Sequence, residues 1–182
     1  MSVRSGFISM ALLVTIAGVG CSTAMRMRNA VARAEALMYN TSGGAIGTAQ
    51  LWQDANGVVQ VEISSITLPA GTHGIHFHDV GKCESPSFTT AGGHYNPMGM
   101  EHGLQNPKGP HAGDNPNIVI PAGGIGNVSF STDRVSLTPG TRTLLDADGT
   151  SLVIHASADD QVTNPSGNSG ARIACGVVRA IP

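Results

Sequence analysis

The sequence predicts an all-β domain in which antiparallel strands form a sandwich or a flattened barrel. Extended runs recur along the chain with turn signals between them, and no long helical pattern interrupts them. Glycine is abundant, at 24 residues, which is typical of a chain rich in turns and loops. We expect one domain, because 182 residues are enough for a single sizeable core.

The clearest hairpin signal lies between residues 50 and 63. Two extended runs, 50–53 and 58–63, flank Asp54-Ala55-Asn56-Gly57, and the Asn-Gly pair favours a tight turn. Further strands are predicted at 117–120 and 127–130 around Gly123-Gly124, at 143–145 and 151–155 around Asp148-Gly149, and at 172–181.

Two long segments lack strand character, residues 79–116 and residues 156–171. Loops of this length in a compact domain are usually functional or disordered, and these carry metal-ligand residue types, which favours function. Charged residues are sparse, with a formal net charge of -2 and no basic run. We therefore expect no nucleic-acid partner.

The N-terminal residues 1–24 differ from the rest of the chain. Arg4 is followed by an apolar run from residue 7 to residue 19 and then by small residues, which indicates a secretory signal too short for a convincing membrane span. A buried N-terminal helix is the alternative. Residues 25–36 read as a tether or a short frayed helix, and the folded domain is expected over 37–182.

All seven histidines fall in one part of the chain, from residue 73 to residue 155. A neutral imidazole offers a nitrogen lone pair at ordinary pH, which makes histidine the commonest side-chain metal ligand. Nitrogen-rich sets suit copper and zinc, and three imidazoles with one carboxylate suit zinc. The spacing therefore predicts a two-metal site.

Strand geometry indicates how some of these ligands converge. His76 and His78 are two residues apart on a predicted strand, so their rings lie on one face, and His155 ends another apolar strand. His94 comes from the long loop. His73 lies three residues before His76, so strand parity directs it away from that face, and we interpret it as a core histidine or one that supports a ligand.

The ordered set resembles the copper-zinc superoxide dismutase family over roughly residues 37–182. The segments that carry the resemblance are His76-Phe77-His78, Gly92-Gly93-His94, His102, His111-Ala112-Gly113-Asp114, His155 and Gly170-Ala171-Arg172-Ile173-Ala174-Cys175-Gly176. The resemblance implies an eight-stranded Greek-key sandwich or flattened barrel with two long functional loops. It also implies that superoxide is converted to oxygen and hydrogen peroxide as copper alternates between Cu(II) and Cu(I), beside a structural zinc ion.

The resemblance assigns roles residue by residue. It implies a copper set, a zinc set that shares one histidine with it, and an aspartate that links a copper histidine to a zinc histidine. The shared histidine is also implied to help deliver a proton. These residues are His76, His78, His94 and His155 for copper, His94, His102, His111 and Asp114 for zinc, and Asp159 as the link, with Asp160 interpreted as a solvated acid.

Arg172 is implied to dock superoxide, because a guanidinium is an always-charged donor fork and the substrate is a small anion. A surface arginine at a strand edge is the alternative. The preceding segment 163–170 is neutral, which is similar to the bacterial branch of the family, so Lys82 or Lys108 would be the other sources of an attracting field. Met98 and Met100 are interpreted as exposed loop residues.

The three cysteines divide into an implied pair and an odd residue. By resemblance, Cys83 and Cys175 form a disulfide, and two free thiols with one metal ligand among them are the alternative. Cys21 then needs an explanation. It follows Gly18-Val19-Gly20, an imperfect lipoprotein signal, so lipidation and membrane anchoring through Cys21 are expected, with cleavage after Ser22-Thr23-Ala24 as the alternative.

These expectations place the protein outside the cytoplasm, in a bacterial periplasm or as a membrane-anchored lipoprotein, and alternatively as a secreted protein. A homodimer is a state that an exposed apolar patch on the sandwich would permit. The rival function is a non-catalytic copper- or zinc-binding protein on the same scaffold, which would show losses among the copper ligands or at Arg172.

Overall fold

Ten β-strands account for most of the regular structure of the computed structural model, which describes residues 27 and 29–182. The predicted signal segment and Cys21 lie outside the described residues. Among the described residues, no helix is long and apolar enough to cross a membrane. The elements are β1 (Ala32–Asn40), β2 (Ala45–Gln53), β3 (Val59–Thr67), β4 (Gly71–His73), β5 (Ile75–His78), the 3-10 turn η1 (Thr89–Ala91), β6 (Ile118–Ile120), β7 (Ile125–Thr132), β8 (Ser151–His155), β9 (Arg172–Val177) and β10 (Arg179–Ile181).

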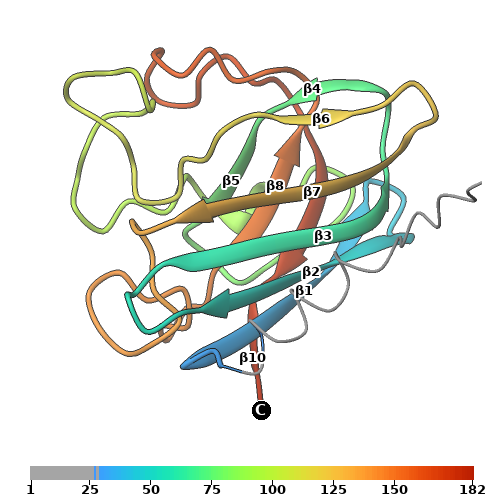
Figure 1. The fold of residues 1–182 in the computed structure, drawn as a ribbon. Helices are drawn as coiled ribbons and strands as arrows, with labels where there is room; N and C mark the ends of the chain where they lie inside the picture. Colours follow the sequence, from blue (N-terminus) through green and yellow to red (C-terminus); the bar gives the residue numbers. More distant parts are fainter. Residues whose placement is uncertain (1–26, 28) are drawn as a thin grey trace, which may run out of the picture.

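Eight strands form one curled antiparallel sheet in the order β5-β8-β9-β1-β2-β3-β7, with β10 pairing with β1 (Figure 1). β4 and β6 form a separate antiparallel pair. The chain leaves β3 to place β5 at the far edge of the sheet, and then returns to pair β7 with β3. The predicted all-β antiparallel fold class is therefore confirmed.

The hairpin of β2 and β3 forms as predicted around the Asn56-Gly57 turn. Gln53 faces Val59 across the two strands, and Gly57 donates its N–H to the Asp54 carbonyl at 3.1 Å. Gly57 has a φ of 86°, a left-handed conformation that glycine adopts without steric penalty. Alternating residues of these strands enter the core, where Leu51 and Ile63 are buried.

The start of the domain differs from the prediction. β1 begins at Ala32, so the last part of the predicted tether 25–36 belongs to the sheet. The inward positions include Ala34 and Ala36, both fully buried, alternating with Arg33 and Glu35. Alanine gives little apolar contrast with its neighbours, so the sequence carries no clear period-two pattern at this point.

The connection from β7 to β8 also differs from the prediction. Residues 143–145 do not form a strand with 151–155; Thr143 makes only an isolated bridge with Ser136. Leu144 is buried and its carbonyl accepts a hydrogen bond from Thr150 Oγ1 at 2.9 Å. Leu144 is thus apolar because its side chain anchors a turn-rich connection to the core, and not because it belongs to a strand.

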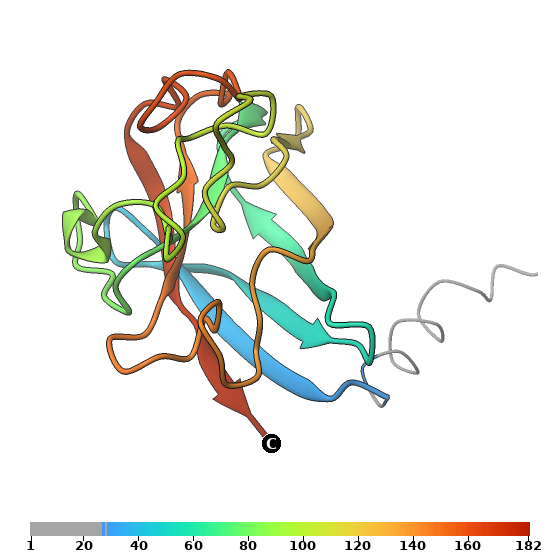
Figure 2. The ribbon, with the colours of Figure 1, turned by 90° about the vertical axis from the view of Figure 1, so that its left-hand side faces the viewer.

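The predicted last strand is interrupted. Val178 separates β9 from β10: its N–H donates to the Thr150 carbonyl at 3.0 Å, the position next to the Ser151–Val177 pair of β8 and β9, and β10 then pairs with β1. The two predicted loops, 79–116 and 156–171, lie side by side at one end of the sheet (Figures 1 and 2). The candidate site is built where these loops meet β5 and β8.

Candidate metal centre

β5 and β8 position three of the histidines. The two strands pair antiparallel, with His76 opposite Val153 and His78 opposite Ser151, and His155 is the last residue of β8. All three imidazole residues are buried. The fourth, His94, arrives from the long loop and forms an isolated bridge with His78, so its ring joins those of the sheet.

These four histidines present a convergent set of nitrogens without protein partners. His76 Nδ1, His78 Nε2, His94 Nε2 and His155 Nε2 are buried and make no hydrogen bond. The four residues offer ligand atoms that all lie within 4.8 Å of one another. Buried polar atoms are nearly always paired, so four unpaired nitrogens at one point indicate a position for a cation. Four imidazole nitrogens are a set that suits copper.

The opposite nitrogen of each strand-borne ring is held by a hydrogen bond. His78 Nδ1 lies 3.0 Å from the Gly92 carbonyl, and His155 Nδ1 lies 3.1 Å from the Gly170 carbonyl. A carbonyl oxygen can only accept a hydrogen bond, so each ring must donate its Nδ1–H. The Nε2 lone pair is then directed at the shared point. The two loops therefore set the tautomers of histidines that the sheet places.

Burial lowers the pKa of three of these four histidines, which favours their neutral form in the metal-free protein. Desolvation lowers the pKa of His155 to about 3 and that of His94 to about 4, and neighbouring positive groups add to the effect. The pKa of His78 is also well below its ordinary value, chiefly through burial. Neutral rings have free lone pairs, as metal ligands require.

A second set surrounds the carboxylate of Asp114. His94 Nδ1, His102 Nδ1 and His111 Nδ1 lie 2.9, 3.0 and 3.4 Å from Asp114 Oδ1. Ligands of a tetrahedral zinc ion with bonds of about 2.0–2.1 Å are about 3.3 Å apart. These separations and the three-nitrogen, one-oxygen composition fit zinc. His94 faces both sets, with Nδ1 on this side and Nε2 on the other.

Two backbone donors hold the other carboxylate oxygen. Asp114 Oδ2 accepts hydrogen bonds from the N–H groups of Gly103 at 2.9 Å and His111 at 3.0 Å. Gly103 has a φ of 112°, and a Cβ there would lie 2.3 Å from the Gln161 carbonyl oxygen, so only glycine fits. Burial would raise the pKa of Asp114, but hydrogen bonds from the neighbouring histidines outweigh it and hold the pKa well below its usual range.

Asp159 connects the two sets. Its Oδ2 lies 2.7 Å from His76 Nε2, and its Oδ1 lies 3.0 Å from His102 Nε2. These nitrogens face away from the two ligand sets, so the third group of potential ligands, His76, His102 and Asp159, is a hydrogen-bonded bridge and not a third metal position. Asn117 fixes the bridge by pairing its side-chain amide with both the N–H and the carbonyl of Asp159, each at 2.8 Å.

His102 lies between two carboxylates that favour its protonated form. Burial lowers its pKa, but Asp114 at one ring nitrogen and Asp159 at the other outweigh burial and raise the pKa to about 9. Both nitrogens are thus protonated at neutral pH in the absence of metal. Zinc binding at Nδ1 must displace one of these protons.

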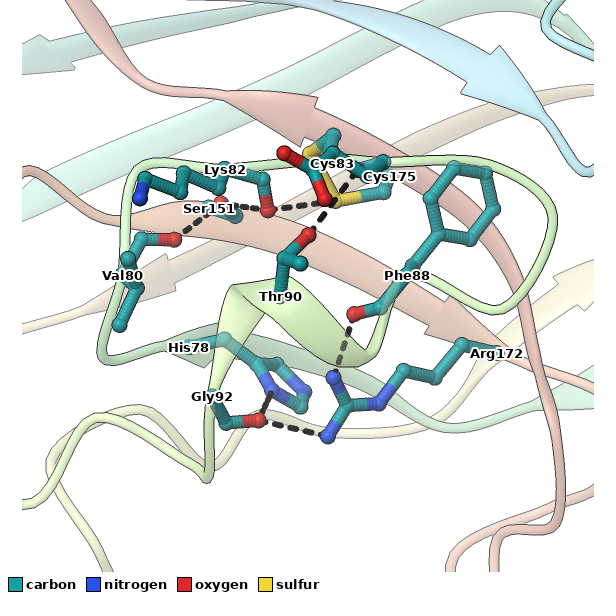
Figure 3. The surroundings of a disulfide bond; sticks show 11 residues. His78, Val80, Lys82, Cys83, Phe88, Thr90, Gly92, Ser151, Arg172 and Cys175 are labelled. Atoms are coloured by element: carbon teal, nitrogen blue, oxygen red, sulfur yellow. Dashed lines mark hydrogen bonds between the residues drawn. A yellow bond between two sulfur atoms is a disulfide. The ribbon is translucent and has the colours of Figure 1, made fainter.

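Arg172 begins β9 and is half-buried beside the first set (Figure 3). Its two terminal nitrogens donate to the carbonyls of Phe88 and Gly92, each at 2.6 Å. The Gly92 carbonyl also accepts from His78 Nδ1, so the guanidinium is one acceptor away from a copper-type histidine. Arg172 is therefore not a loose surface arginine.

The disulfide between Cys83 and Cys175 is present, as expected, with a sequence separation of 92 residues. It joins the loop that carries Phe88 and Gly92 to β9, three residues after Arg172 (Figure 3). The loop is also packed by Phe88, which is fully buried against Cys175 and its neighbours. The bond consequently holds the two carbonyl acceptors and the guanidinium in one unit.

The remaining predicted residues fall outside the two ligand sets. His73 uses both ring nitrogens on backbone carbonyls, those of His155 at 2.8 Å and Pro69 at 2.9 Å, which fits a core histidine. Lys108 lies 3.3 Å from Glu101, so its charge is paired, whereas Lys82 is exposed. The loop methionines are exposed, 61% for Met98 and 42% for Met100.

Sequence reasoning missed two residues that contact this centre. One is Asn117, described above. The other is Arg134, just after β7, whose guanidinium donates to the Asp114 carbonyl at 2.6 Å. Neither belongs to a spaced motif, and only the folded chain brings them to the centre, so the sequence pattern carried no signal for them.

A curled all-β domain with a four-imidazole set and a zinc-type set that share one histidine defines a two-metal protein. The family model for copper/zinc superoxide dismutase matches residues 45–178 of this chain. Superoxide dismutase [Cu-Zn] 2 of Aquifex aeolicus is 43% identical over 81% of this chain and 86% of its own length. The chain belongs to the copper/zinc superoxide dismutase family.

Another relative is named only as superoxide dismutase-like. The superoxide dismutase-like protein YojM of Bacillus subtilis is 41% identical over 78% of this chain and 73% of its own length. A solved structure of a SOD-like protein from Bacillus subtilis, a double mutant with one tyrosine and one proline changed to histidine, has a TM-score of 0.76. It is 42% identical and covers 79% of this chain and 95% of that chain.

Proposed function

We propose that this protein converts superoxide to oxygen and hydrogen peroxide, with copper held by His76, His78, His94 and His155 and zinc held by His94, His102, His111 and Asp114. The observation that carries the proposal is the set of four buried imidazole nitrogens that converge without partners. Bound copper supplies one-electron chemistry, so that two superoxide ions and two protons give one oxygen and one hydrogen peroxide.

The protein's own groups bind the substrate and handle its protons. Arg172 attracts and orients the anion, because its guanidinium is fixed by two carbonyls while further N–H donors remain. His94 presents Nε2 on the copper side, and this is the atom at which a proton is held and passed to the reduced substrate. Its Nδ1, on the zinc side, keeps the ring in place.

A non-catalytic metal-binding protein on the same scaffold is the second candidate, favoured by the relative named superoxide dismutase-like. Such a protein would lack a copper ligand or the anion-docking arginine. This chain has all four imidazoles and Arg172.

Metal analysis beside a superoxide assay separates the two candidates. We expect about one copper and one zinc per chain together with rapid dismutation. Full copper loading without activity would overturn the enzymatic proposal and support a metal-binding role.

We also propose that the protein is exported and anchored through a lipid on Cys21, on the basis of its N-terminal sequence alone. Mass analysis of the membrane fraction should find diacylglycerol on Cys21. A mature N-terminus at Met25 would instead support a secreted, unanchored protein. A homodimer remains a prediction that sedimentation of the purified domain tests.

A further inference from the structure

Arg134 is a partly buried arginine for which dismutation gives no role. It lies on the connection between β7 and β8, which supplies no ligand to either set, and its NH2 group donates to the main-chain oxygen of Asp114 at 2.6 Å. Its own N–H donates to Thr132 Oγ1 at 3.2 Å, which fixes the start of the connection.

The position of this contact matters because Asp114 is the centre of the zinc-type set. On the N-terminal side, the Gly113 carbonyl accepts a hydrogen bond from the Phe77 N–H of β5 at 2.9 Å. On the C-terminal side, Arg134 holds the carbonyl of Asp114 itself. The residue that places a carboxylate oxygen among three imidazoles is thus anchored on both sides, once by the sheet and once by Arg134.

Arg134 is poorly explained as a contribution to stability alone. Its Nε is buried and has no hydrogen-bond partner, which is unfavourable in a folded protein. Burial also lowers its pKa, against the opposing charges of Asp133 and Asp114. An apolar side chain of similar length would avoid both penalties, so the arginine is better explained by what it does to Asp114.

We propose that Arg134 is a positioning residue for zinc: it fixes the Asp114 peptide so that the carboxylate is held in the zinc-binding geometry before the metal arrives. Groups that orient metal ligands typically change metal affinity by about 10- to 100-fold when they are removed. The inference depends on zinc binding and not on dismutation, so zinc measurements test it even if the superoxide assay fails.

The test is zinc competition between a chelator and the metal-free full chain. Arg134→Met should raise the zinc Kd by about tenfold or more, and should change the Tm of the metal-free protein little. Arg134→Lys should recover part of the affinity, because it restores the charge and one donor. Cobalt(II) in the same site should lose intensity in its tetrahedral absorption bands in Arg134→Met and regain some in Arg134→Lys.

Arg142→Met is the matched control. Arg142 lies on the same connection and also donates to a backbone carbonyl, that of Asp133 at 2.8 Å, but it is exposed and its acceptor belongs to neither ligand set. Its zinc Kd should equal that of the unmodified protein. If Arg134→Met fails to fold, Arg134→Gln replaces it, since it is too short to reach the same carbonyl.

Two results would overturn the proposal. One is a zinc Kd for Arg134→Met within about twofold of the unmodified protein. The other is an equal loss of affinity in Arg142→Met. A lowered Tm with unchanged zinc affinity would show that Arg134 only stabilises the fold.

Discussion

Replacing Arg172 with alanine tests how this site attracts an anionic substrate. A guanidinium has five N–H donors, and the bonds to Phe88 and Gly92 use two of them, which leaves donors for superoxide. Burial lowers the pKa of Arg172, so the group is partly desolvated and its field is screened less than that of a fully exposed cation. Arg172→Ala removes this charge and replaces none of the proposed metal ligands.

The expected loss follows from the strength of one charged contact. A hydrogen bond to a charged group contributes about 1.5–3 kcal/mol, and the lower part of that range applies here because Arg172 is only half-buried. Since about 1.4 kcal/mol is a factor of ten in rate, kcat/KM should fall by roughly one to two orders of magnitude. Arg172→Lys should recover part of the rate, because the charge returns without the planar fork.

Stopped-flow decay of superoxide at low and high salt is the assay, with copper and zinc content measured on each sample. Salt should slow the unmodified protein more than Arg172→Ala, because screening weakens an attraction that the variant has already lost. Arg179→Ala is the control, since Arg179 is an exposed arginine on β10. Equal rates for the unmodified protein and Arg172→Ala at low salt would refute the docking role and direct attention to Lys82.

Three further outcomes are expected. His155→Ala should lose copper and activity but keep most of its zinc, because only one set contains it; metal analysis showing full copper would contradict the ligand assignment. Reducing the Cys83–Cys175 disulfide, with its separation of 92 residues, should lower the free energy of unfolding by about 4.6 kcal/mol in the chain-entropy model; coincident denaturant curves with and without reductant would count against this. Because the pKa of His102 is raised to about 9 in the metal-free protein, zinc affinity should fall with decreasing pH below that value, by up to about tenfold per unit; a flat chelator-competition profile between pH 6 and 9 would exclude proton competition. The stability of the metal-free fold changes in the opposite direction: the protonated His102 stabilises that fold fully below its unfolded pKa of 6.5, and this contribution is lost as pH rises through about 9.

The sequence predicted the strands whose inward residues are large and whose turns carry strong signals. The β2–β3 hairpin is the clearest case, with buried Leu51 and Ile63 on either side of an Asn-Gly turn. The first residues of β1 were not predicted as strand because the inward residues there are alanines. Leu144 was misassigned to a strand because a single buried leucine can anchor a connection as well as a sheet, and sequence pattern does not separate the two.

The spacing of the histidines indicated the candidate ligands, but it could not indicate their tautomers. Those depend on the carbonyls of Gly92 and Gly170, which come from the two loops and meet the rings only in the folded chain. The same holds for Arg134, which reaches Asp114 from the segment between the predicted strands 127–130 and 143–145. Local patterns specify the residue types of a metal centre, whereas its orienting hydrogen bonds are tertiary.

The pKa shifts of His155 and His102 are opposite because burial acts on the two rings beside different partners. On the copper side, His78 and His155 donate to backbone carbonyls, so desolvation dominates and the pKa of His155 falls to about 3. On the zinc side, His102 lies between two carboxylates, and their charges outweigh the same desolvation. Asp159 connects the halves through hydrogen bonds to His76 and His102, while His94 spans them through its two ring nitrogens. A displacement of either loop therefore disturbs both ligand sets, and the groups that fix the loops act on copper and zinc together.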